Sequence, residues 1–170
     1  KRCDRDASGI PVLRIPNVVG GKINVSDLKF IELSKQRVDR LRLHVGDLLF
    51  VRTNGNREYV GRSAVFKGEL PEALFASYLI RVRLKTEGFL PDFVQIYTMI
   101  SKGKAYLSGR ASGAADGKFN INQQIIKSVL LPMPPLDERR KIVETVQVSD
   151  AKIAAEEQRK AALEELFRSA

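Results

Sequence analysis

Short runs in which apolar and polar residues alternate, rich in β-branched and aromatic side chains, mark five strands in the first half of the chain. They predict strands at residues 12–15, 28–33, 48–53, 62–66 and 77–84. Turn signals separate these runs. Gly20-Gly21 closes an early turn, and Asn54-Gly55, between two of the predicted strands, is the strongest short-range hairpin signal in the chain.

A helical repeat replaces the alternation after the last of these strands. Pro91 suits the first position of a helix, and Phe93, Ile96, Tyr97 and Ile100 then share one face. We expect Gly103 to end this helix. The predicted fold class is α+β, with helices packed on a curved, mostly antiparallel sheet.

Residues 129–146 read V-L-L-P-M-P-P-L-D-E-R-R-K-I-V-E-T-V, an apolar strand that passes through three prolines into a charged helix. Each proline fixes φ and pushes the preceding residue toward extended geometry, so residues 132–135 form a stiff elbow. Residues 136–170 contain no Gly or Pro, and acidic side chains occupy the first turn. This pattern predicts one long, coiled-coil-like helix of about 50 Å.

The apolar positions of this helix fall on a spacing of four and then three, interrupted by Ser149, Glu156 and Lys160. A single helix would leave this stripe in water, and unpacked helices are marginally stable. We therefore expect a second helix, from another copy or from a second half of the protein, to cover it, with the polar interruptions making the pairing loose. The residues expected to pair are Ile142, Val146, Ile153, Leu163 and Phe167.

Length and charge divide the 170 residues into a head and a stalk. Residues 1–131 suffice for one globular domain, followed by the elbow at 132–135 and the helix at 136–170. The helix holds 7 basic and 8 acidic residues, which leaves 22 basic and 12 acidic residues before it. A basic head on a neutral stalk suits a polyanion such as DNA; basic charge kept for solubility alone is the alternative.

Cys3 is the only cysteine, so the chain can build neither a disulfide framework nor a thiolate metal site. No stretch has the length of a membrane-spanning helix, and the first residues lack the apolar core of a signal peptide. These features predict a cytoplasmic protein that does not enter a membrane.

Two polar segments carry the side chains suited to DNA. The first, residues 52–57, is expected at an exposed hairpin tip, where guanidinium and carboxamide groups can read guanine and adenine edges; a solvated turn is the alternative. The second, residues 102–122, is expected to be a loop close to a DNA backbone or base, or else a mobile surface connection. The candidate DNA-binding residues are Arg52, Thr53, Asn54, Asn56, Arg57, Arg62, Lys102, Lys104, Arg110, Ser112, Lys118 and Asn120.

Several neighbouring residues have an open role. Asn120 and Asn122 could instead cap the short helix that follows. Tyr59 and Tyr106 could stack on bases or belong to the core, and Arg14 and Lys22 could touch phosphates. The sole histidine, His44, supports neither a catalytic triad nor a metal site, and Asp47 is expected to bond backbone amides in a turn.

Three segments together carry a resemblance to a known family. They are I-P-V-L-R-I-P-N-V-V-G-G-K-I at 10–23, L-H-V-G-D-L-L-F-V-R-T-N-G-N-R-E-Y-V-G-R-S-A-V-F at 43–66, and the elbow P-x-P-P-L-x-E-x-x-x-I-V with the N-I-N-Q-Q-I-I-K-S-V that precedes it. Their order and spacing resemble a target recognition domain in the specificity subunit of type I restriction-modification enzymes.

This resemblance implies recognition of specific double-stranded DNA on behalf of a separate methyltransferase (modification) subunit and a separate restriction subunit. It implies no catalytic residue, cofactor or metal in this chain. Specificity subunits of the family usually carry two recognition domains and two helices, and this sequence has room for one of each. A half subunit that dimerises and a fragment are both compatible with it, and a start without methionine favours the fragment.

Other functions remain as alternatives. The same domain could be the tail of a fused restriction-methylation enzyme, in which case methyltransferase motifs would precede it in the reading frame. A small enzyme is disfavoured because the sequence has no phosphate-binding glycine fingerprint, metal-ligand cluster or S-adenosylmethionine glycine motif. A coiled-coil adaptor would leave the basic head unexplained.

Overall fold

The computed structural model describes residues 2–3, 9–86 and 88–169, with the backbone alone at residues 2, 3 and 169. The chain separates into two compact units, Lys1–Pro132 and Met133–Ala170. The side chain of Cys3 and the final residue, Ala170, lie outside the described part, so the expectations for them stay predictions.

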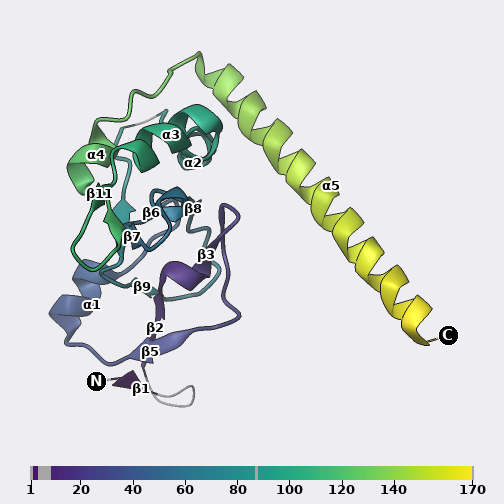
Figure 1. Ribbon diagram of the computed structural model, residues 1–170, viewed down its shortest axis with the longest axis horizontal. Coiled ribbons are helices and arrows are strands. Elements are labelled where there is room, and N and C mark those ends of the chain that lie inside the picture. The colour runs from purple at the N-terminus through teal and green to yellow at the C-terminus, as the bar shows by residue number, and fades with distance from the viewer. Residues whose placement is uncertain (1, 4–8, 87, 170) are drawn as a thin grey trace. The chain divides into compact units, whose positions relative to one another are not determined.

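In its described residues the first unit holds short strands and four α-helices, α1 to α4, which Figure 1 labels. Its strands are β1 (Arg2–Cys3), β2 (Ile10–Leu13), β3 (Val18–Val19), β4 (Lys22–Ile23), β5 (Lys29–Ile31), β6 (Leu48–Val51), β7 (Thr53–Asn54), β8 (Ser63–Val65), β9 (Leu74–Phe75), β10 (Leu79–Val82), β11 (Ser112–Gly113) and β12 (Phe119–Asn120). Its helices are α1 (Lys35–Leu41), α2 (Pro91–Met99), α3 (Ser101–Gly109) and α4 (Gln123–Lys127), with 3-10 turns at Ile15–Asn17 and Arg57–Tyr59.

The strands form four small sheets, in the orders β1-β5-β2-β9, β10-β6-β8, β11-β12-β7 and β3-β4. Within the described residues the β2–β9 pair is parallel and every other pair is antiparallel. The five predicted strands correspond to β2, β5, β6, β8 and β10. The predicted α+β class with mostly antiparallel strands is therefore confirmed.

Strand β6 is buried on both faces and organises the core. Leu49 and Val51 enter one apolar cluster, together with Leu13 and residues of β3 and β4. Leu48 and Phe50 point the other way, into a second cluster that includes Leu107 of α3. Because successive side chains of a strand face opposite sides, an uninterrupted apolar run such as L-L-F-V serves two cores at once.

The tight hairpin turn lies at Gly20-Gly21 and not at Asn54-Gly55. Both glycines have positive φ, 57° and 80°, and they join β3 to β4 with Val19 paired to Lys22, as a two-residue turn of the mirror-image type requires. Gly55 is absent from the positive-φ glycines of the described chain. The strands on either side of Asn54-Gly55, β6 and β8, do pair antiparallel as the hairpin signal predicted. Their connection is longer than a two-residue turn, because it includes β7, which pairs with β12.

The helix predicted from Pro91 ends earlier than expected. It stops at Met99, and Ile100 is extended and half exposed between α2 and α3. Gly103 lies inside α3, so the expectation that it ends a helix was wrong. A Cβ placed on Gly103 would lie 2.1 Å from the carbonyl oxygen of Tyr97 and 2.8 Å from Cα of Thr98. Gly103 therefore permits the close approach of α3 to the end of α2.

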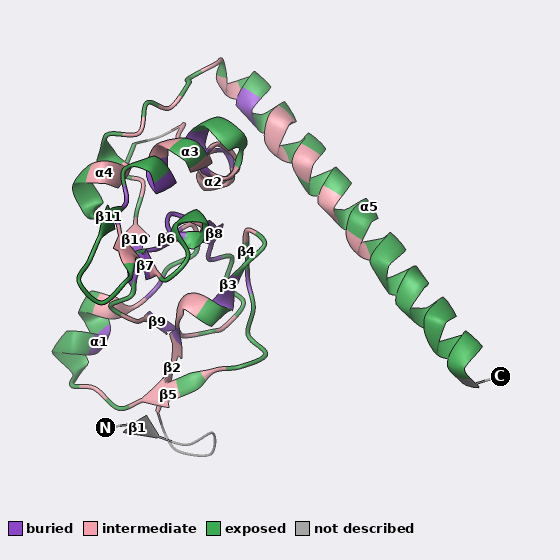
Figure 2. Ribbon diagram, viewed as in Figure 1, coloured by how far each residue is buried: buried purple, intermediate pink, exposed green. Residues whose placement is uncertain are grey.

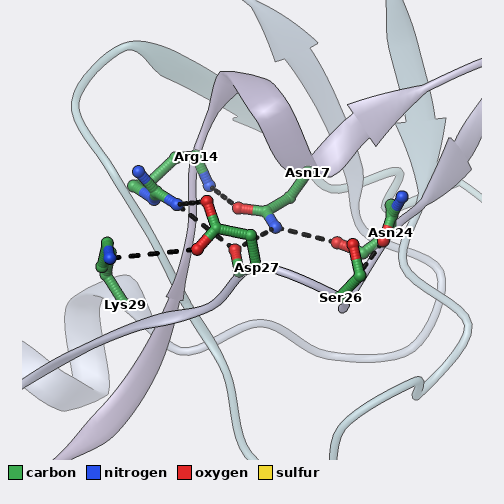
Figure 3. Close-up of polar contacts among 6 residues, drawn as sticks. All are labelled: Arg14, Asn17, Asn24, Ser26, Asp27 and Lys29. Carbon is green, nitrogen blue, oxygen red and sulfur yellow. Dashed lines mark hydrogen bonds and ion pairs between the residues drawn. The ribbon is translucent and has the colours of Figure 1, made fainter. Parts of the chain in front are cut away.

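Polar bonds hold the segment between β2 and β5 (Figure 3). The buried side chain of Asn17 accepts a bond from the amide of Arg14 at 2.8 Å and donates to the carbonyls of Asn24 and Asp27 at 2.8 and 2.9 Å. Arg14 also forms an ion pair of 2.8 Å with the Asp27 carboxylate. These contacts give Arg14 a structural partner, and they fix the base of the β3–β4 hairpin.

The second unit contains one helix, α5 (Leu136–Ser169), so the predicted long helix is confirmed. Its C-terminal half is exposed (Figure 2), including Ile153, Leu163 and Phe167, whose side chains are 57%, 48% and 82% accessible. Pairing of this stripe stays a prediction. No helix in the described part of the chain is long and apolar enough to span a membrane.

Two glycines of α3 give a matched test of the close contact with α2. Gly103→Ala should lower the free energy of unfolding by about 1–3 kcal/mol or more, because the new methyl group meets main-chain atoms that cannot move aside. Gly109→Ala meets nothing within 4 Å and should change stability little. Denaturant unfolding of both variants measures the difference; equal stabilities would show that the helices do not pack this closely.

Candidate nucleic-acid interface

The main chain of Arg52 lies where three segments meet. Its amide donates to the carbonyl of Tyr78, and its carbonyl accepts from the amide of Ile121, both at 2.9 Å. On one side Val51 pairs with β10, and on the other Thr53 pairs with β12. The exposed side chain of Arg52 therefore leaves a backbone that is bonded in both directions.

A polar groove of about 530 Å³ lies beside this junction. It brings together four of the candidate residues from the two separate polar segments. The groove is lined by Arg52, Thr53, Ser77, Tyr78, Ala114, Ala115, Asp116, Lys118 and Asn120. Pairing of β7 with β12 is what joins residues 52–53 to residues 118–120, because Asn120 lies opposite Thr53.

Arg52 and Thr53 of the groove, and Asn54 and Asn56 just after them, differ in what they offer to a ligand. Arg52 is exposed and makes one long contact of 3.5 Å to the Ser77 carbonyl. Thr53 is only 7% accessible, so its side chain has little surface left for DNA. Asn54 and Asn56 use their Oδ1 atoms to accept backbone amides within the turn, each at 2.9 Å. Their NH₂ groups are the part that a base could meet.

Lys118 and Asp116 form an exposed ion pair of 2.7 Å at one wall of the groove. The hydrogen bond between the two side chains raises the pKa of Lys118 and lowers the pKa of Asp116, so both stay charged at neutral pH. Tyr78, 60% accessible, lines the same groove. Sequence reasoning missed Tyr78 because residues 77–84 were assigned to a strand, and nothing in the local pattern marks an exposed tyrosine.

Arg57 is exposed, as Arg52 is, but it contacts other parts of the head. Its Nη2 donates to the carbonyl of Ala111 at 2.8 Å, and its guanidinium lies 5.3 Å from the ring centre of Phe119. These contacts tie the turn after β7 to the segment between α3 and β12. The side chain is thus engaged within the protein rather than presented at a tip.

Arg62 and Lys104 lie in a second, smaller hollow of about 260 Å³ that also includes Gly20 and Gly61. The guanidinium of Arg62 stacks 3.6 Å from the ring centre of Tyr59, which leaves this tyrosine outside the core. Lys104 pairs with Glu58 at 2.7 Å, and this hydrogen bond lowers the pKa of Glu58. This hollow and the groove around Arg52 have no lining residue in common, so the candidates do not form one cluster.

The second polar segment is only partly a loop, which corrects the expectation for residues 102–122. Lys102, exposed, and Lys104 lie on α3, and β11 and β12 form a hairpin further on. Arg110 stacks 3.6 Å from the ring centre of Tyr106, whose hydroxyl donates to the Ser128 carbonyl at 2.7 Å. Ser112 Oγ lies 3.4 Å from the Asn120 carbonyl.

Two further expectations about polar residues are confirmed. Asn122 caps α4, accepting the amide of Ile125 at 2.9 Å. Asp47, 1% accessible, accepts the amide of His44 at 2.9 Å. Asp47 also forms two bonds of 2.6 Å with Arg83, a partner that the sequence did not reveal.

The described residues include no group of three or more His, Cys, Asp or Glu side chains that could hold a metal ion.

Comparison of the sequence with known proteins identifies the family of this chain. The profile described as "Type I restriction modification DNA specificity domain" matches residues 1–165. The chain belongs to this family. The chain is 33% identical over 140 residues to the type I restriction enzyme EcoKI specificity subunit of Escherichia coli K12, covering 82% of the chain and 30% of that protein. It is 27% identical over 147 residues to the StySPI specificity subunit of Salmonella potsdam, covering 86% of the chain and 32% of that protein.

The chain thus spans about a third of the length of the curated relatives it matches. Within this specificity domain, the three segments that carried the resemblance have clear structural places. Residues 10–23 run from β2 to β4, residues 43–66 run from the Asp47 turn through β6 to β8, and the proline elbow leads into α5. Of the family segments, residues 43–66 supply Arg52 and Thr53 to the polar groove, and the stretch before the elbow begins with Asn120.

The different surroundings of Arg57 and Arg52 predict different effects of truncation. Arg57→Ala should lower the free energy of unfolding by about 1–2 kcal/mol, because a charge-assisted bond to the Ala111 carbonyl is lost. Arg52→Ala should leave stability within about 0.5 kcal/mol, as expected for an exposed side chain. Thermal unfolding of both variants measures this, and equal destabilisation would contradict the distinction.

Proposed function

We propose that the head of this specificity domain, residues 1–131, recognises a specific sequence in double-stranded DNA through the groove around Arg52. The domain acts as part of a specificity subunit and carries no catalytic step itself. Its role is to deliver a modification (methyltransferase) subunit and a restriction subunit to their target. Family membership and the names of the relatives, all type I specificity subunits, support this proposal.

The observation that carries it is the convergence of Arg52, Lys118 and Asn120 on one polar groove. A guanidinium can donate two bonds to the O6 and N7 of guanine, and a carboxamide can pair with adenine in the major groove. A backbone held on both sides fixes the base of the Arg52 side chain, so no backbone entropy is lost there on binding. The surrounding charge excess, 22 basic against 12 acidic residues before α5, favours approach of a polyanion.

The partners are proposed in the same way. The type I names of the relatives favour separate modification and restriction subunits over the alternative, a fused restriction-methylation enzyme. Methyltransferase motifs upstream in the same reading frame would decide for the fused enzyme. Helix α5 serves as a spacer that pairs with a second such helix, from another copy or from a second half of the subunit, and holds two recognition domains apart.

DNA binding should depend strongly on salt and on Arg52. The target can be selected from a pool of random duplexes with the full chain, alone and with the modification subunit, which should sharpen binding. Arg52→Ala should then cost about 1–3 kcal/mol on the selected duplex and little on random DNA. Fluorescence anisotropy at several salt concentrations measures both affinities; the wild-type affinity should fall steeply as salt rises.

Lys85→Ala is the matched control. Lys85 is an exposed cation outside the groove; it follows β10, whereas Tyr78 of the groove precedes β10. It should leave discrimination between the two duplexes unchanged. If Arg52→Ala weakens binding to the selected and the random duplex equally, Arg52 contacts phosphate and not bases. Salt-independent binding by the wild type, or no binding with the modification subunit present, would disprove the proposed function.

The spacer role of α5 predicts weak self-association of the full chain. The double variant Ile153→Asp, Leu163→Asp places two carboxylates on the apolar stripe and should shift the protein from a concentration-dependent dimer toward monomer. Light scattering over a range of concentrations measures the shift.

Ala155→Asp, Ala162→Asp is the control, since both alanines are exposed and lie off the stripe. It introduces the same charges into the same helix and should leave association unchanged. If the wild type and both variants are the same monomer at high concentration, and binding to the modification subunit is also unchanged, α5 is not an assembly element.

A further inference from the structure

Helix α1 presents two arginines that the sequence did not single out. Val38 is buried and Leu41 is half buried, which fixes the helix on the head, while Arg37 and Arg40 are exposed. The two arginines are three residues apart, so they lie on one face of the helix, with Cβ atoms about 5–6 Å apart. Asp39 is one or two residues from each and does not share that face.

Arg37 and Arg40 border a hollow of about 580 Å³. Its floor is apolar, formed by strands β2, β5 and β9 and the segments beside them, and includes Val12, Leu74 and Phe75. Its far wall is Ala76-Ser77. Ser77 also lines the polar groove, and its carbonyl is contacted by Arg52. The hollow under α1 and the groove around Arg52 are therefore neighbours that share one wall.

The charges around this shared wall are uncompensated. Arg37, Arg40 and Arg52 make no ion pair within the described chain, whereas Arg42, Arg83, Lys104 and Lys118 each have a carboxylate partner. Like charges side by side on a helix face destabilise it slightly. A surface that gathers unpaired guanidiniums is suited to an external anion, and guanidinium groups bind phosphate with two parallel bonds.

We propose that Arg37 and Arg40 anchor the phosphate backbone of the same duplex whose bases face Arg52, so that α1 sets the register of the DNA without reading its sequence. The inference rests on the proposed function. Successive phosphates of one strand advance about 3.4 Å along the duplex axis, so two flexible arginine side chains three residues apart reach neighbouring phosphates. Phosphate contacts of this kind position a protein, and base contacts give it specificity.

The test compares the full chain with the double variant Arg37→Ala, Arg40→Ala on the selected and on a random duplex. Each phosphate contact contributes about 0.9 to the slope of log K against log salt. The variant should lose between one and two units of that slope and bind both duplexes more weakly by the same factor, roughly tenfold, with discrimination intact. Arg37→Lys, Arg40→Lys should restore most of the slope, because the charges return.

Lys85→Ala, Lys127→Ala removes two exposed cations elsewhere on the head and controls for net charge. If it lowers the slope as much as the α1 variant does, the effect is general and the anchor is disproved. Neutral methylphosphonates placed along the selected duplex add a positional readout: one or two positions should weaken wild-type binding and leave the α1 variant unaffected. The absence of any such position also disproves it.

Two outcomes separate the anchor from the proposed function. If the wild type binds the duplex in a salt-dependent way and the α1 variant keeps the wild-type slope, the anchor alone is wrong. If the wild type binds a polyglutamate peptide and the Arg37→Ala, Arg40→Ala variant does not, while its DNA binding is unchanged, the α1 surface binds an acidic protein and not DNA. If the wild type does not bind duplex DNA even with the modification subunit, both inferences fail together.

Discussion

The backbone bonds of Arg52 are the constraint on which the candidate interface depends. One residue joins the buried strand β6 to the turn at Tyr78 and to the end of β12. Because β6 is packed between two apolar clusters, the core fixes the position of the Arg52 main chain, which directly follows β6. The groove is thus built on a rigid base, although the segments that line it are short and exposed.

Electrostatic pairing decides which of the many basic side chains remain available. Arg83 is neutralised by the buried Asp47, and Arg14 by Asp27. Arg57 is used to join two segments of the head. Net charge alone would treat these residues and Arg52 alike. Their contacts separate cations that stabilise the fold from cations that face outward, and three of the latter, Arg37, Arg40 and Arg52, line the two hollows that share Ser77.

The proposed function combines these features with the stalk. A rigid groove suits base reading, since a side chain displaced by an ångström no longer makes two bonds to one base. An anchor on α1 would fix where along the duplex that reading occurs. In this proposal the exposed apolar stripe of α5 would join two such heads, and the spacing of the two half-targets would follow from helix length.

Local patterns in the sequence were sufficient for five of the strands, the long helix and the family. Alternation and the enrichment in β-branched and aromatic residues located β2, β5, β6, β8 and β10, and the absence of Gly and Pro located α5, because these signals depend on residues that are close in the chain. The same local reasoning failed at Gly103, where the close approach of α3 to the end of α2 requires a glycine inside the helix. At Asn54-Gly55 it found the pairing of β6 with β8 but not the intervening β7, whose partner β12 is distant in the chain.

The candidate site shows the same division. The residue types suited to DNA could be read from the sequence, and Arg52, Lys118 and Asn120 were among them. Which of these residues meet was decided by tertiary structure, because β7 pairs with β12 across more than sixty residues. That pairing brings Lys118 and Asn120 to the groove of Arg52, and the bond from the Arg52 amide to the Tyr78 carbonyl adds Tyr78. Arg57 instead donates to the Ala111 carbonyl. The sequence determined which side chains suited to DNA are present, and long-range strand pairing determined which of them meet at the surface.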